Sequence, residues 1–221
     1  MILPKKAAQP LPRVIRYAES EIPTVRGPLN TIVFREVVAG IPDPGKEHVA
    51  LVVGEVRRAE DPVLSRIHSE CVTSEVFGSL KCDCRQQFDH ALDRCFAEGV
   101  GVVLYLRQEG RGIGLGNKIK AYALQQQGAD TVQANHQLGF ETDHRRYDIA
   151  AHMYQDLGID AVRLMTNNPD KVLQLENHGI RVIKRLPILM KPTVHSEQYL
   201  VTKRDKCGHL IDSLVISPSN G

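Results

Sequence analysis

Arg66-Ile-His-Ser-Glu-Cys71 and Leu80-Lys-Cys82-Asp-Cys84 together place three thiols in the pattern C-x10-C-x-C. Cysteine thiolates are soft ligands that suit zinc, and three protein ligands with one open position are typical of a catalytic zinc site. The residues between the thiols are largely polar, which argues against a role in packing alone. We therefore expect Cys71, Cys82 and Cys84 to bind one zinc ion.

The patterns on either side of this stretch predict an α/β fold. β-Branched runs at 29–38 and 48–56, separated by a Pro/Gly-rich loop, predict a hairpin, and 63–68 predicts the strand that leads to Cys71. After it, predicted strands and helices alternate, which favours a partly parallel sheet. The expected fold is a mixed sheet in three layers, with helices on its faces and a hairpin-like N-terminal half. Further strands are predicted at 101–106, 161–165 and 180–183, and helices at 86–98, from the glycine-rich loop to about 128, at 147–157 and from 167 to 179.

Composition sets limits on organisation and partners. The 221 residues are 42% hydrophobic and 24% charged, with a net charge of +2, so no basic field predicts nucleic-acid binding. No apolar run predicts a membrane span or a signal peptide, and five cysteines without an export signal indicate a reducing, cytoplasmic location. We expect a loosely ordered arm at 1–26, a single catalytic domain at 27–210 and a tail at 211–221.

A glycine-rich loop, Arg107-Gln-Glu-Gly-Arg-Gly-Ile-Gly-Leu-Gly-Asn-Lys118, lies between a predicted strand and a predicted helix. This layout presents backbone N–H groups to phosphate, although the loop matches neither common phosphate-binding pattern and could be merely flexible. Arg107 and Arg111 in the loop, with Lys118 and Lys120 in the helix, favour a cradle for a phosphate chain.

Three further polar segments allow both functional and structural interpretations. His68 and Glu70 form H-x-E, as in zinc nucleobase deaminases, but could equally form hydrogen bonds or a salt bridge at a strand end. Asp143-His-Arg145 could be a surface charge cluster. Thr166-Asn-Asn-Pro-Asp-Lys171 could cap a helix, or could present helix N–H groups to a substrate.

Taken together, these segments resemble GTP cyclohydrolase II, in its monofunctional, riboflavin-pathway form, over about residues 29–210. Five blocks in one order carry the resemblance: Arg66-Ile-His-Ser-Glu-Cys, Leu80-Lys-Cys-Asp-Cys, Arg107-Gln-Glu-Gly-Arg-Gly-Ile-Gly-Leu, Asn135-His-Gln-Leu-Gly-Phe and Thr166-Asn-Asn-Pro. One departure is Arg85, where the family usually has glycine, which places an extra charge beside the expected metal.

The resemblance implies a role for each matching residue. It implies zinc on Cys71, Cys82 and Cys84, a proton acceptor at Asp143, a nucleophile at Arg145 and a tyrosine beside the purine ring at Tyr122. The implied GTP contacts are Arg66, Ile67, His68, Ser69, Glu70, Gln87, Glu109, Gly110, Arg111, Thr131, Thr166 and Lys171. It further implies Mg²⁺ bound with the triphosphate, and a homodimer.

The implied reaction opens the imidazole ring of GTP by hydrolysis and releases formate and pyrophosphate. The product is 2,5-diamino-6-(5-phosphoribosylamino)pyrimidin-4(3H)-one, which could feed riboflavin or a specialised metabolite. Three alternatives stay open: a variant that stops at the formamidopyrimidine, a zinc nucleotide deaminase and a zinc-stabilised nucleic-acid-binding module. Because a guanidinium has no free lone pair, Arg145 could also stabilise charge on phosphorus instead of attacking it.

Overall fold

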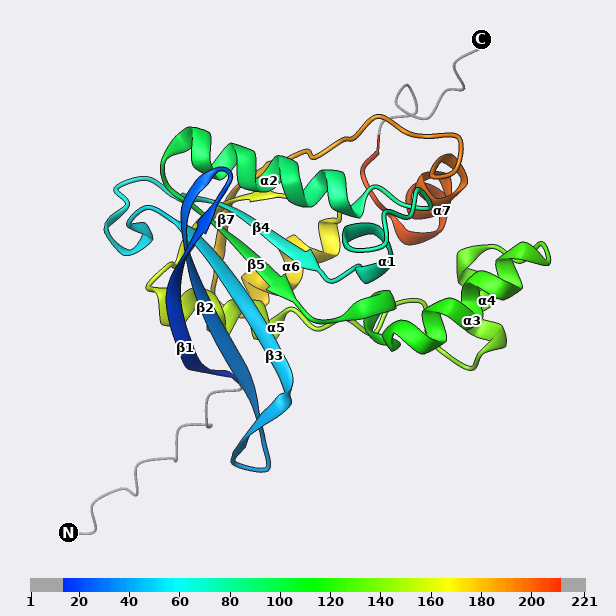
Figure 1. Cartoon of the computed structure of the whole chain (residues 1–221), viewed down its shortest axis with the longest axis horizontal. Coiled ribbons are helices and arrows are strands. Elements are labelled where there is room, and N and C mark those ends of the chain that lie inside the picture. Colours follow the sequence, from blue (N-terminus) through cyan, green and yellow to red (C-terminus); the bar gives the residue numbers. More distant parts are fainter. Residues whose placement is uncertain (1–13, 212–221) are drawn as a thin grey trace.

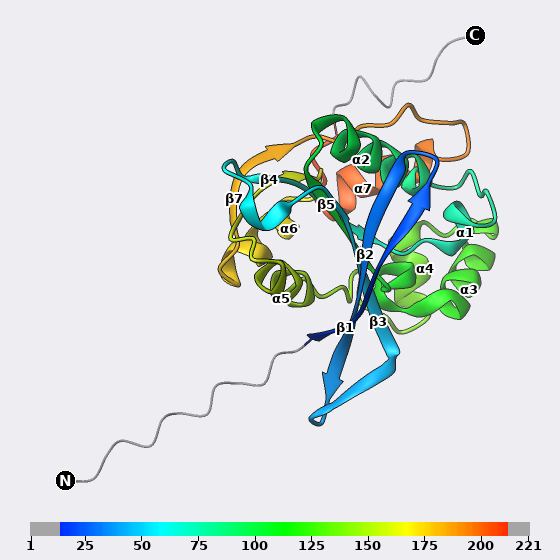
Figure 2. The same ribbon diagram turned by 60° about the vertical axis from the view of Figure 1, so that its left-hand side comes forward.

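The structure is a computed structural model that describes residues 14–211. One seven-stranded sheet has the strand order β1-β2-β3-β5-β4-β6-β7. The sheet runs through the middle of the molecule (Figures 1 and 2). The strands are β1 (Val14–Thr24), β2 (Gly27–Val38), β3 (Ile41–Val53), β4 (Val63–Ser69), β5 (Gly101–Leu106), β6 (Ala161–Met165) and β7 (Arg181–Leu186). The helices are α1 (Val72–Glu75), α2 (Cys84–Glu98), α3 (Gly114–Gln126), α4 (Thr131–Gln137), α5 (Asp148–Leu157), α6 (Pro169–Asn177) and α7 (Glu197–Cys207), with 3-10 turns η1 (Val56–Arg58) and η2 (Glu109–Gly112).

The sheet is mixed, as the sequence predicts. The β1, β2, β3 and β5 strands pair antiparallel, whereas β5, β4, β6 and β7 pair parallel. Helix α2 packs on one face and helices α5 and α6 on the other, which gives the expected three layers (Figure 1). Successive residues of β4 serve the two faces: Leu64 packs under α2, whereas Val63 and Ile67 pack in the larger core that includes α5.

The parallel strands determine where the site forms. Their carboxyl ends meet at one edge of the sheet, since Ser69 of β4 pairs with Leu106 of β5, and Thr166 follows β6 directly. The segment with the three thiols, the glycine-rich loop and the Thr166 segment all begin at this edge. Crevices at the carboxyl ends of parallel strands are the usual ligand sites of α/β sheets.

The structure differs from the expected N-terminal arm. Within the range 1–26, residues 14–24 form β1 and pair with β2 over its whole length. Only Val14 of β1 is buried, and its other side chains are mostly charged or exposed. An edge strand that covers little apolar surface leaves a weak alternating pattern in the sequence, which explains the error. Residues 1–13, and residues 212–221 of the predicted tail, lie outside the described part.

Three helices lie in segments where the sequence predicted none: the four-residue α1, α4 and α7. Helix α4 lies between the predicted helices that end near 128 and begin at 147. Its cap is Asp130, which accepts from the backbone N–H groups of Val132 and Gln133 in a capping box. Helix α7 was missed because its apolar residues Tyr199, Leu200 and Val201 are contiguous and form no helical stripe. Within residues 14–211, no helix has the length and apolar character needed to cross a membrane.

Candidate active site

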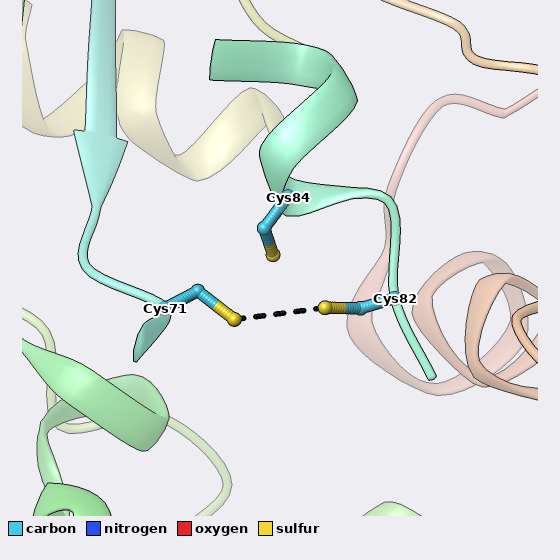
Figure 3. Close-up of side chains that lie close together, drawn as sticks. All are labelled: Cys71, Cys82 and Cys84. Atoms are coloured by element: carbon cyan, nitrogen blue, oxygen red, sulfur yellow. Dashed lines mark hydrogen bonds between the residues drawn. The ribbon is translucent and has the colours of Figure 1, made fainter. Parts of the chain in front are cut away.

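Three thiols meet where β4 ends and α2 begins. Cys71 follows β4, Cys84 is the first residue of α2, and Cys82 lies in the loop before it. The sulfurs point toward one another (Figure 3), with 3.6 Å between the Sγ atoms of Cys71 and Cys82 and all three within 4.8 Å of one another. Cys95 of α2, by contrast, is fully buried in the core between this helix and the sheet, where it packs against apolar side chains.

The geometry of the thiols fits a soft divalent ion. Sulfurs bound to one tetrahedral zinc at about 2.3 Å lie about 3.8 Å apart, close to the distance observed here. Within residues 14–211, no other cysteine, histidine or carboxylate joins this group. The thiols can therefore hold a metal ion and leave one position open for water or substrate, which is the arrangement of catalytic sites.

A partly buried lysine, Lys118, supports negative charge on the thiols. The Nζ atom of Lys118 lies 3.2 Å from the Sγ of Cys71 and also donates to Thr73 and Glu109. Hydrogen bonds from Cys82 and Cys84, with a contribution from Lys118, lower the pKa of Cys71. The same thiol contacts raise the pKa of Cys82 and Cys84, because those two thiols act as donors. One thiolate is therefore favoured before any metal binds.

His68 is occupied by hydrogen bonds and is no metal ligand in this arrangement. Its Nδ1 accepts from the Nε of Arg66 at 3.3 Å, so its Nε2 carries the proton and donates to Glu75 at 2.6 Å. The Tyr105 hydroxyl donates to the same carboxylate at 2.5 Å. Burial lowers the pKa of His68 to about 4, so the imidazole is neutral near pH 7. In zinc deaminases the histidine of the H-x-E motif binds the metal, whereas His68 here is held by hydrogen bonds to Arg66 and Glu75.

Arg66 is a buried cation held by neutral groups. Its guanidinium donates to His68, to the carbonyl of Met165 at 3.3 Å and to the Oε1 of Gln87 at 2.5 Å. The Nε2 of Gln87 donates in turn to Asp83, at 2.5 Å. Burial lowers the pKa of Arg66 to about 10, which leaves it charged at neutral pH and able to interact with an anion in the cavity.

The glycine-rich loop holds a strained backbone beside the thiols. Gly110 and Arg111 both adopt left-handed conformations, with φ of 63° and 62°. For Arg111 this conformation costs on the order of 1 kcal/mol, and such strain clusters at functional sites. Glu109 is buried; it accepts from the backbone N–H of Val72 at 2.7 Å and from Lys118 at 2.7 Å. The loop is thereby attached to the segment that carries Cys71.

Two further cations, Arg145 and Lys171, line the cavity. Arg145 forms a bidentate ion pair with Asp143, with an Nη2–Oδ2 distance of 2.5 Å. Lys171 is buried and donates to the carbonyl of Ile67 at 2.8 Å. Burial and the neighbouring cations Arg145 and Arg66 lower the pKa of Lys171. An anion that bound here would relieve this repulsion.

These groups line one cavity of about 330 Å³. All of the predicted site residues line it except Ile67, whose side chain is in the core, and Asp143, which is paired with Arg145. Of the four cations predicted around the glycine-rich loop, Arg111 and Lys118 line the cavity, whereas Arg107 and Lys120 do not. Six lining residues come from the C-terminal segment, to which the sequence analysis assigned no role: His195, Tyr199, Thr202, Lys203, His209 and Ile211.

Arg85, the residue that departs from the family pattern, contacts α1 and α2 and does not line the cavity. Its Nε donates to Asp89 at 2.6 Å, and its Nη1 donates to the carbonyl of Glu75 at 2.8 Å. Its charge is thus paired, and its hydrogen bonds tie the end of α1 to the start of α2.

Comparison with known proteins agrees with this geometry. The family model described as GTP cyclohydrolase II matches residues 15–187. This chain belongs to the GTP cyclohydrolase II family. It is 48% identical over 194 residues to GTP cyclohydrolase-2 of Haemophilus influenzae (strain PittGG), a match that covers 88% of each chain.

Two other relatives extend the comparison. GTP cyclohydrolase-2 of Yersinia pseudotuberculosis (serotype I, strain IP32953) is 49% identical over 196 residues, covering 89% of this chain and 97% of that protein. Riboflavin biosynthesis protein RibBA of Bacillus subtilis (strain 168) is 50% identical over 197 residues. That match covers 83% of this chain but half of RibBA, so the chain spans about half the length of this relative.

We predict that Cys82→Ser protein, reconstituted with zinc and freed of excess metal, retains far less zinc than the wild type, for which we expect one ion per chain. The reason is that the alcohol of serine is a weaker and harder ligand than a thiolate. Metal content per chain, determined by mass spectrometry of the digested protein, measures the effect. Cys95→Ala is the matched control and should retain the zinc, because Cys95 lies in the core. Equal zinc in Cys82→Ser and wild type would contradict the site.

Proposed function

We propose that this protein catalyses the zinc-dependent hydrolytic opening of the guanine imidazole ring of GTP, with release of formate and pyrophosphate. The product is 2,5-diamino-6-(5-phosphoribosylamino)pyrimidin-4(3H)-one. The single observation that carries the proposal is a three-thiol group with an open side, in one cavity with Arg111, Arg145 and Lys171. Family membership supports the reaction, and the name of the RibBA relative supports a place in riboflavin biosynthesis.

The metal end of the cavity provides for ring opening. Cys71, Cys82 and Cys84 would hold zinc, which would supply Lewis-acid chemistry and make water acidic enough to ionise near pH 7. The Lys118 ammonium, hydrogen-bonded to Cys71, offsets part of the negative charge of the thiolates. Tyr122 lines the cavity, and its ring lies 5.8 Å from the Nζ of Lys118, the lysine that contacts Cys71. We propose that this ring lies beside the purine.

The cationic end of the cavity provides for the triphosphate. Arg111, Arg145 and Lys171 come from three different segments and can bind different oxygens of the chain. Mg²⁺ brought with GTP would neutralise further oxygens, as is usual for nucleotide phosphates. Arg66, Gln87 and the other predicted contacts line the same cavity and are proposed to complete the nucleotide site.

For Arg145, the contacts favour charge stabilisation over nucleophilic attack. Burial alone lowers the pKa of Arg145, but the nearby Tyr147 and Asp143 raise it overall. Burial raises the pKa of Asp143, but the hydrogen bonds from Arg145 lower it overall. Asp143 is therefore a poor proton acceptor toward Arg145, and the guanidinium keeps its charge and has no lone pair to attack phosphorus.

We further propose that the enzyme is a cytoplasmic homodimer. The free thiols of the site are compatible with a reducing compartment. The homodimer rests on the family resemblance.

The direct test is incubation of the zinc-loaded protein with GTP and Mg²⁺. We expect loss of the purine ultraviolet band, with one formate and one pyrophosphate released per GTP consumed. Ammonia in place of formate would indicate a deaminase, and loss of the band without formate would indicate the variant that stops at the formamidopyrimidine. An unchanged purine band with zinc-loaded protein would refute the proposal.

We predict that Arg145→Met lowers kcat about 100- to 1,000-fold, the range seen when one group that stabilises transition-state charge is removed. Intact-protein mass spectrometry of the wild type, quenched during turnover, should show no guanylyl adduct. Arg146→Met is the matched control, because Arg146 is half exposed and pairs with Glu36 and Asp148. An adduct in the wild type that is absent from Arg145→Lys would show instead that Arg145 is the nucleophile.

A further inference from the structure

The C-terminal segment 195–211 forms one wall of the cavity, although the family model matches only residues up to 187. In Figure 1, α7 lies beyond the carboxyl ends of the parallel strands, near α1 and the start of α2. None of the residues that the family resemblance implies for the site lies in this segment. Its polar side chains in the cavity therefore have no function assigned by the reaction as described so far.

The segment is anchored on several sides of the cavity. The Nζ of Lys203 lies 3.3 Å from the Oδ1 of Asp83, between the two cysteines of the C-x-C pair. Lys206 pairs with Asp130, the cap of α4, at 2.5 Å. The backbone N–H of Leu210 donates to the carbonyl of Asn167 at 2.8 Å. Attachment to three separate elements makes α7 a fixed wall of the site.

A glycine turn brings His209 back toward the cavity. Gly208 ends α7 with φ of +65°, a left-handed conformation that glycine adopts without the penalty of a Cβ. The next residue, His209, donates its backbone N–H to the carbonyl of Lys203 at 3.1 Å. The turn thus places the imidazole on the cavity wall together with Lys203.

The charges that act on His209 are dominated by cations. Burial lowers the pKa of His209 to about 2, with further lowering by Lys203, Arg145, Lys171 and Arg111. These four cations belong to α7, the loop before α5, α6 and η2, respectively. Carboxylates pair with two of them, as Asp83 does with Lys203 and Asp143 with Arg145, whereas Lys171 has no carboxylate within ion-pair distance in the described chain.

From this position we infer that His209 is a further substrate-binding residue, whose imidazole N–H donates a hydrogen bond to the phosphate chain of the nucleotide. A neutral imidazole has one donor and one acceptor nitrogen, so it can donate to a phosphate oxygen without a charge of its own. An anion bound at this point would also be attracted by the cations on the surrounding elements and would reduce the repulsion among them. The inference rests on the proposed function, because it names a new contact in the same site.

The test compares binding of inorganic pyrophosphate and of guanosine to zinc-loaded full-length protein, by calorimetry with Mg²⁺ present. We expect His209→Ala to weaken pyrophosphate binding about 10- to 100-fold, as for the loss of a hydrogen bond to a charged group, and to leave guanosine binding unchanged. His209→Gln should restore part of the pyrophosphate affinity, because its amide N–H can extend toward the same oxygen. If His209 served folding alone, His209→Ala would weaken the binding of pyrophosphate and of guanosine to a similar extent.

The matched control is Leu210→Ala. Leu210 is the next residue in the turn and is 51% exposed, and its backbone bond to Asn167 does not need the side chain. This variant should bind both ligands as the wild type does. If the wild type opens GTP but His209→Ala binds pyrophosphate equally well, the inference is wrong and the proposed function stands. If the wild type neither opens GTP nor binds pyrophosphate, both are wrong.

Discussion

The parallel pairing of β4 with β5 and β6 is the constraint on which the rest of the site depends. It brings the ends of three strands to one edge of the sheet, so that residues 69, 106 and 165 deliver three different segments to the same place. One segment carries the thiols, the second carries the strained loop and the third carries Lys171. Helices on both faces bury these strands, and so the positions of their ends are set by the core and not by the loops.

Charge is the second feature that shapes the cavity. The site buries Arg66 and Lys171 without carboxylates within ion-pair distance in the described chain, and it pairs Arg145 and Lys203 with Asp143 and Asp83. Burying a cation without a carboxylate partner costs folding free energy. Such buried charges are typical of sites that bind a ligand of the opposite charge. The nucleotide we propose brings that charge in its phosphates. Binding and stability should therefore be linked, because the phosphate chain removes repulsion that the free protein carries.

The sequence predicted most of the fold and many of the residues that line the cavity. The thiols were found because soft ligands in a tight spacing leave a pattern, and the strands of the parallel half were found because burial on both faces makes them continuously apolar. The edge strand β1 and helix α7 were missed because neither buries a regular apolar stripe. The network of His68, Glu75 and Tyr105 was missed because its members are joined only by tertiary contact. His209 was missed for the same reason, since no spacing in the sequence relates it to Lys171 or Arg111.

The central claim is that three sulfurs hold a hydrolytic metal ion with one position open to the nucleotide cavity. X-ray absorption spectroscopy at the zinc edge of the reconstituted protein tests this claim most directly. The account predicts three sulfur neighbours at about 2.3 Å and one oxygen or nitrogen neighbour at about 2.0 Å. Four sulfur neighbours, or a shell made of oxygen and nitrogen without sulfur, would contradict it.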